Sequence, residues 1–154
     1  MSFAFTHLIG AWLSGKLYEF AFKKKIPHYV WFFLLAGAIL PDIDYLIDWT
    51  LGTKIHRTFT HSILFVILAP LLLYFILSII GHSQKKRLSL AVGAGIATHL
   101  ILDYLGGGNG IPLFWPSLFR FSIDGISYSL VRIPLLEASK ESLRNAMKDT
   151  ILDM

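Results

Sequence analysis

Two short stretches decide how this chain is interpreted: Leu-Pro-Asp-Ile-Asp at residues 40–44 and His-Arg-Thr-Phe-Thr-His at residues 56–61. They place carboxylates, imidazoles and a guanidinium between long apolar segments. Charged and polar groups beside a bilayer core are costly, so we treat them as candidates for function. Asp and His are also ligands of zinc and manganese. Three further residues of these types, His7, His99 and Asp103, lie elsewhere in the chain.

The composition is that of a membrane protein. Of the 154 residues, 55% are hydrophobic and only 16% are charged, whereas a soluble domain carries about 25% charged residues. The absence of cysteine excludes disulfides and thiolate metal ligands. The net charge of +4 comes from basic residues beside apolar segments, which indicates membrane topology. We therefore expect membrane lipids, and no nucleic acid, as partners; the sequence does not specify an oligomeric state.

Four apolar segments predict transmembrane helices: residues 3–22, 29–47, 62–80 and 88–105. The second crosses only if residues after Pro41 extend it, and the glycine-rich residues 106–110 predict a mobile loop. Residues 111–116, with two prolines and Trp115, predict an interfacial loop, and residues 135–152 an amphipathic surface helix. The expected fold is all-α, an integral membrane four-helix bundle. Residues 1–125 form its membrane-embedded part and residues 126–154 a C-terminal surface segment of the same domain.

Basic residues predict the orientation of these helices. Cytoplasmic loops are enriched in Lys and Arg, and seven lie at or near the first and third turns: Lys16, Lys23, Lys24, Lys25, Lys85, Lys86 and Arg87. The opposite side holds three, Lys54, Arg57 and Arg120. Because successive spans alternate in direction, every Asp and His singled out above falls at the other, extracytoplasmic end. We therefore expect a multi-pass protein of the plasma or inner membrane with its site on that side.

Each motif has a functional and a purely structural interpretation. His99 and Asp103 share one helix face, as metal ligands or as a polar pair that satisfies itself. Asp42 and Asp44 end a helix, but two carboxylates so close repel unless a cation or proton intervenes.

The stretch at residues 56–61 also has a functional and a structural interpretation. His56 and His61, five residues apart, fit a loop ligand and a ligand at a helix entry. Thr60 is placed to cap the third helix. Arg57 is either a topological charge or a bidentate phosphate ligand.

The order of these motifs resembles the YdjM-like family of inner-membrane metal-dependent hydrolases. The resemblance covers roughly residues 1–120 and includes Ile-Pro-Leu-Phe-Trp-Pro at residues 111–116; the glycine run at residues 106–110 departs from the more polar turn expected there. The His-x-x-x-Asp element is also similar to one in zinc-dependent phospholipase C. The family resemblance implies the following metal ligands: His7, Asp42, Asp44, His56, His61, His99 and Asp103.

Two functions follow as hypotheses. The first is a hydrolase with one or two divalent ions, zinc or else manganese, acting on a phosphate ester of a lipid or lipid-linked substrate. Asp42 or Asp44 would be the general base and Arg57 would hold the developing negative charge. The second is a non-catalytic metal-binding membrane protein, a carrier or a structural metal site in a complex. A carrier predicts polar residues along the bundle, and the segment at residues 62–80 has no ionisable residue.

Overall fold

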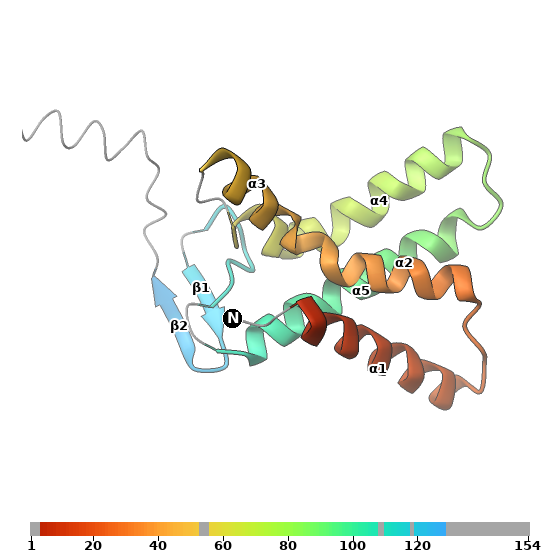
Figure 1. Ribbon diagram of the computed structural model, residues 1–154, viewed down its shortest axis with the longest axis horizontal. Coiled ribbons are helices and arrows are strands. Elements are labelled where there is room, and N and C mark those ends of the chain that lie inside the picture. The colour runs from red at the N-terminus through yellow and green to blue at the C-terminus, as the bar shows by residue number, and fades with distance from the viewer. Residues whose placement is uncertain (1–3, 53–55, 108–109, 118, 129–154) are drawn as a thin grey trace, which may run out of the picture.

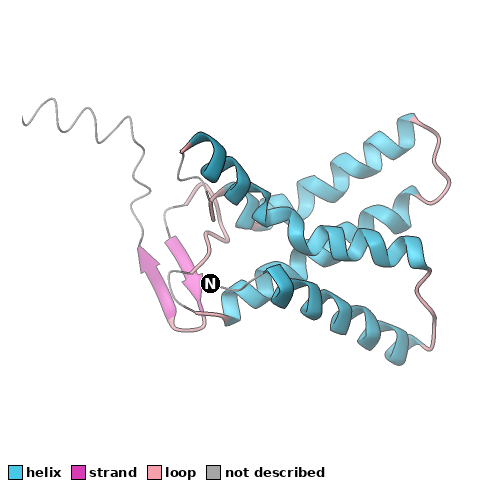
Figure 2. Ribbon diagram, in the orientation of Figure 1, coloured by secondary structure: helices cyan, strands magenta, loops and turns pink. Residues whose placement is uncertain are grey.

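The chain is mainly helical, as predicted. The computed structural model describes residues 4–52, 56–107, 110–117 and 119–128. In chain order its elements are α1 (Ala4–Phe22), α2 (His28–Ile39), the 3-10 turn η1 (Leu40–Asp42), α3 (Ile43–Leu51), the 3-10 turn η2 (Phe59–His61), α4 (Ile63–Ile79), α5 (Lys85–Leu105), β1 (Phe119–Ser122) and β2 (Gly125–Tyr128) (Figures 1 and 2). The predicted helix at residues 135–152 lies outside the described residues.

Helix α5 is the centre of the packing and contacts α1, α2 and α4. Its closest neighbour is α2, because glycines remove side chains where the two backbones meet. A Cβ atom on Gly95 would collide with the backbone of Leu34 and Ala38, and one on Gly37 with the backbone of Val92. Small residues permit this kind of approach between helices in lipid. The backbones of α2 and α5 therefore approach so closely that a residue with a side chain would not fit at Gly37 or Gly95.

The second predicted span is one helical path with a local change of geometry. Pro41 lacks an N–H group and cannot continue the α-helical hydrogen bonds, and the chain passes through η1 before α3 resumes. Gly52, with φ of 65°, ends α3 in the left-handed conformation that glycine adopts without strain. Helix α3 thus extends four residues beyond the predicted end at residue 47.

The bundle has two distinct ends (Figure 1). The α1–α2 and α4–α5 connections lie at one end, with one basic run in the first connection and the other at the start of α5. Helix α3 and the β-hairpin lie at the other, together with η2, which packs against η1. The motifs of the first stretch, in η1 and α3, and of the second, in η2, therefore share an end of the molecule.

The hairpin at that end was not predicted. Strands β1 and β2 are antiparallel, with Phe119 paired to Tyr128 and Ser122 to Gly125. Ile111 forms a bridge with Phe121, so residues 110–113 run from the hairpin to α4, where the Ile63 N–H donates to the Leu113 carbonyl at 2.9 Å. Part of the predicted interfacial loop is thus buried, with Ile111 fully covered and Phe114 exposed. The predicted boundary after residue 125 falls inside β2, and the division into two parts stays a prediction.

Two helical segments in the described residues are long and apolar enough to cross a membrane, His28–Leu51 and Lys85–Leu105. Helix α4 is apolar but shorter, with 17 residues. Four crossings thus remain a prediction.

Candidate metal centre

One face of α5 contributes two side chains to the centre. His99 and Asp103 are one turn apart and both are buried, as their spacing predicts. The Nδ1 of His99 lies 2.7 Å from the Ala38 carbonyl oxygen of α2. A carbonyl only accepts, so this nitrogen donates to it and Nε2 faces the centre.

Asp42 and Asp44 enter the centre from different sides. Residues two apart on a helix point about 200° away from each other, and η1 and α3 keep roughly that relation. Asp42 Oδ1 lies 3.6 Å from both His61 Nε2 and His99 Nε2. Asp44 instead lies behind His61, with Oδ2 3.6 Å from its Nδ1. The two carboxylates therefore lie near opposite nitrogens of the His61 ring, Asp42 at Nε2 and Asp44 at Nδ1.

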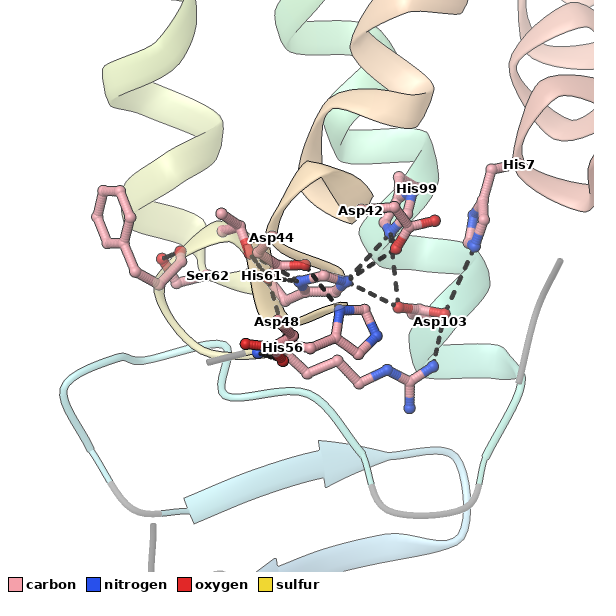
Figure 3. A network of polar contacts seen from close by, with 12 residues as sticks. His7, Asp42, Asp44, Asp48, His56, His61, Ser62, His99 and Asp103 are labelled. Atoms are coloured by element: carbon pink, nitrogen blue, oxygen red, sulfur yellow. Dashed lines mark hydrogen bonds and ion pairs between the residues drawn. The ribbon is translucent and has the colours of Figure 1, made fainter. Parts of the chain in front are cut away.

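Four ligand atoms converge at the middle of the site: His61 Nε2, His99 Nε2, Asp42 Oδ1 and Asp103 Oδ2 (Figure 3). The two nitrogens are 3.3 Å apart, and Asp103 Oδ2 lies 3.4 Å from His61 Nε2 and 3.6 Å from His99 Nε2. Ligands about 2.0–2.2 Å from a tetrahedral zinc ion lie about 3.3–3.6 Å from each other. Five of the six separations between these four atoms therefore have the length that such an ion requires.

The hydrogen bonds of the two rings direct their Nε2 atoms at the carboxylates. Thr60 donates its hydroxyl proton to Asp44 Oδ2, which leaves its oxygen to accept from His61 Nδ1 at 3.0 Å. Because Nδ1 is engaged in both rings, each Nε2 points at the centre. Imidazole nitrogens and carboxylate oxygens this close together require a shared cation or proton.

His61 lies in η2, outside the predicted spans. Its pKa is changed by the neighbouring carboxylates. Burial lowers the pKa of His61, but its contacts with Asp42 and Asp44 outweigh burial and raise the pKa above the ordinary value of 6.5. An environment that favours a proton on this ring also favours a metal cation at its Nε2.

His7 reaches the centre from α1. Its ring stacks on His99 with centroids 3.7 Å apart, and its Nε2 lies 3.6 Å from Asp103 Oδ1. Its buried Nδ1 has no hydrogen-bond partner among the residues that the structure describes. His7 thus closes the centre on the side of α1 and adds one more nitrogen beside Asp103.

Arg57 connects two of the carboxylates. Its φ of 58° is rare for a residue other than glycine. In this conformation its backbone N–H donates to Asp44 Oδ2 at 3.3 Å, and its Nη2 donates to Asp103 Oδ1 at 3.2 Å. The neighbouring His56 donates from Nδ1 to Asp44 Oδ1 at 2.7 Å, and its backbone N–H donates to Asp48 at 2.8 Å.

A second guanidinium lies beside Arg57. Arg120 of β1 donates to the carbonyl oxygens of Arg57 and Gly110, at 3.1 and 3.3 Å. Burial, and then the positive charge of Arg57, lower the pKa of Arg120. The two arginines and Trp115 line a cavity of about 30 Å³, large enough for a water molecule.

The structure brings all seven predicted ligands into one network of contacts; their roles as ligands stay predictions. The predicted cap at Thr60 is wrong. Ser62 caps α4 by accepting from the Phe65 N–H at 3.2 Å, because the Thr60 hydroxyl is taken by Asp44. Arg120 was counted as a topological charge only, since no local pattern ties β1 to residues 56–61.

Comparison with known proteins agrees with the predicted family. The sequence model of the family described as YdjM inner membrane protein matches residues 1–149. The uncharacterized protein YvsG of Bacillus subtilis strain 168 is 36% identical over 112 residues, which cover 65% of this chain and 59% of that protein. The inner membrane protein YbcI of Escherichia coli K12 is 33% identical over 100 residues, 61% of this chain and 57% of that protein.

The matched segments thus span less than two thirds of the length of either relative. No solved structure matches the chain. Because the family match extends over nearly the whole sequence, this chain belongs to the YdjM inner membrane protein family.

Proposed function

We propose that this protein is a multi-pass membrane hydrolase that uses one divalent metal ion to cleave a phosphate ester of a lipid or lipid-linked substrate at the extracytoplasmic face. The observation that carries the proposal is the convergence of His61, His99, Asp42 and Asp103, whose ligand atoms lie 3.3–3.6 Å from one another in the pairs given above. A divalent ion held there supplies Lewis acidity and lowers the pKa of a water molecule bound to it.

Formal charges support a divalent ion. The three carboxylates of Asp42, Asp44 and Asp103 carry three negative charges, and Arg57 is paired with one of them. Two negative charges are then left for the ion to balance. Arg120, which adds a positive charge without a carboxylate contact in the described residues, makes the loaded site attractive to an anion.

The exposure of the side chains divides their roles. His61, His99 and Asp103 are at most 2% exposed and would hold the ion together with Oδ1 of Asp42, which is 24% exposed. The other carboxylate oxygen of Asp42 would accept the proton of the attacking water. Both carboxylate oxygens of Asp44 are engaged by Thr60, His56 and the Arg57 backbone, so Asp44 is assigned as a positioning residue.

Arg57 and Arg120 define the place of the substrate's phosphate. Guanidinium groups bind phosphate oxygens with paired N–H donors, and Arg57 already reaches Asp103 at the centre. A phosphate group bound in the cavity between the two arginines would lie beside the ion. Trp115 lines this position and is partly exposed, which suits a substrate with apolar chains.

One ion fits better than two. His7 Nε2 and Arg57 Nη2 both approach Asp103 Oδ1, at 3.6 and 3.2 Å. A second ion held by His7, His99 and Asp103 would share this oxygen with the guanidinium, and two cations so close would repel. Zinc is our first choice because mixed N and O ligands with tetrahedral spacing suit it, whereas manganese prefers more oxygen ligands in octahedral geometry.

The helices support the membrane topology. Helix α4 is about 26 Å long and α1 about 29 Å at 1.5 Å per residue, close to the roughly 30 Å of a hydrocarbon core. Large apolar side chains such as Phe20, Leu71 and Phe75 are more than half exposed, as expected for contact with lipid. With four spans, the basic connections face the cytoplasm and the metal centre faces outward.

Metal content and hydrolysis of chromogenic phosphate esters and phospholipids, measured on protein purified without a metal-affinity tag, test the proposal. We expect about one zinc per chain and activity that His61→Ala abolishes together with the metal. His82→Ala, a change to an exposed histidine at the basic end, is the matched control and should alter neither. Arg57→Gln should keep the metal and lower activity about 10²–10³-fold.

A non-catalytic metal site is the second candidate. Four protein ligands in a closed tetrahedron are typical of structural zinc, and five of the six separations between the four central atoms suit such a site. Stoichiometric metal without turnover on any ester, combined with a large loss of thermal stability when the metal is removed, would favour this candidate over the hydrolase.

A further inference from the structure

A groove of about 840 Å³ lies between α1, α2 and α5, away from the metal centre. Its walls are the apolar residues Val30, Leu34 and Leu90. Its floor is made of small residues, because Gly15 and Ser14 of α1 face Ala91, Ala94 and Thr98 of α5. The missing side-chain volume on both helices therefore leaves the hollow.

Four basic residues line one end of this groove: Lys24, Lys25, Lys86 and Arg87. None of the residues that line the groove is acidic. The nearby Glu19 is already engaged by Lys16 at 2.9 Å and by the Ile26 N–H at 2.8 Å. The end of the groove therefore carries an uncompensated positive charge.

The dimensions of the groove suit one leaflet of a bilayer. From Lys86 to Thr98 the floor follows α5 for about 18 Å at 1.5 Å per residue. Half of a hydrocarbon core is about 15 Å. A ligand that places an anion among the basic residues would thus lay an apolar chain along the remainder of the groove without reaching the second leaflet.

We propose that this groove, defined by the basic end and the apolar walls together, binds one anionic phospholipid of the leaflet that contains the basic turns. Basic pockets between transmembrane helices bind anionic head groups in this way. The argument from charge favours a lipid over a second copy of the chain, whose own basic turns would be repelled. The inference does not depend on hydrolysis or on a metal ion.

Lipid binding by the purified full chain in detergent, followed by native mass spectrometry with phosphatidylglycerol or phosphatidylcholine, tests the proposal. We expect one phosphatidylglycerol per chain, bound at least tenfold more tightly than phosphatidylcholine. The variant with Lys24→Gln, Lys25→Gln, Lys86→Gln and Arg87→Gln should lose this preference. The control variant with Lys23→Gln and Lys85→Gln removes two neighbouring charges that do not line the groove and should keep the preference.

A change in the apolar part of the groove tests it separately from charge. Ala94→Leu fills the floor and should weaken phosphatidylglycerol binding at least tenfold, whereas Ala36→Leu, at an exposed alanine of α2 outside the groove, should not. Inorganic phosphate at the same concentration should not compete. Equal affinity for the two lipids, equal effects of the two alanine variants, or a dimer that dissociates on Ala94→Leu without lipid loss would each overturn the proposal.

Discussion

Asp44 is two residues from the candidate ligand Asp42, but its contacts suit it to orient His61. It is buried, and its two oxygens receive the Thr60 hydroxyl, His56 Nδ1 and the Arg57 backbone N–H. Through Thr60 it also determines which nitrogen of His61 carries the proton. Hydrogen bonds of this kind orient metal ligands and strengthen their binding. The residue acts on the centre through His61 and need not contact the ion.

The first prediction concerns this residue. Asp44→Asn keeps the side-chain size but replaces one acceptor by an NH₂ group that cannot accept. We expect zinc affinity to fall about 10–100-fold, with the helices intact by circular dichroism. Asp124→Asn, at an exposed carboxylate of the hairpin turn, is the control and should leave the affinity unchanged. Zinc titration with a competing chelator measures both; equal affinities in Asp44→Asn and wild type would contradict the positioning role.

At the scale of elements, the contact between α2 and α5 prepares the centre. Gly95 and His99 lie on one face of α5, one turn apart. The missing Cβ of Gly95 lets α5 approach the backbone of Leu34 and Ala38. That approach brings the Ala38 carbonyl to 2.7 Å from His99 Nδ1. A glycine in the helix interface therefore determines the orientation of a histidine in the centre.

Gly95→Ala should for this reason destabilise the protein by about 1–3 kcal/mol through overpacking and also weaken zinc binding. Gly93→Ala is the matched control, because its new Cβ would meet the Pro70 side chain at 3.2 Å and no backbone that close. Alanine also favours a helix by up to about 1 kcal/mol over glycine, so this variant should be near neutral. Thermal unfolding in one detergent, with and without zinc, compares them; similar losses in both would refute the argument.

At the scale of the whole molecule, the orientation of the bundle in the membrane decides which compartment the centre faces. The basic turns and the centre lie at opposite ends of the helices. Positive charges are retained on the cytoplasmic side. The centre should therefore be open to the extracytoplasmic solvent.

Single cysteines at Thr50 and Ser83 test this orientation, because the chain has no cysteine of its own. Both positions are exposed, Thr50 in α3 and Ser83 in the α4–α5 connection. A membrane-impermeant thiol reagent applied to intact cells should label only the cysteine at position 50, and lysed cells should show both. Labelling of position 83 alone in intact cells would invert the proposed topology.

Much of the architecture was predictable because it depends on local composition. Apolar runs between basic turns predicted the helices, and Pro41 marks the change of geometry in the second one. Alternation of spans then placed His7, His99 and the two motif stretches at one end without any knowledge of contacts. The family prediction is confirmed for the same reason, since it rests on the order and spacing of residues along the chain.

The sequence by itself thus determined a mainly helical membrane protein with its seven candidate Asp and His ligands gathered at one end. Only the tertiary structure decided which atoms meet there: Asp42 beside the two Nε2 atoms, Asp44 behind His61, and Arg120 against Arg57. The physical reason is that spans and ends follow from hydrophobicity summed over many residues. Contacts of single atoms follow from the direction in which a side chain leaves the backbone and from partners distant in the chain.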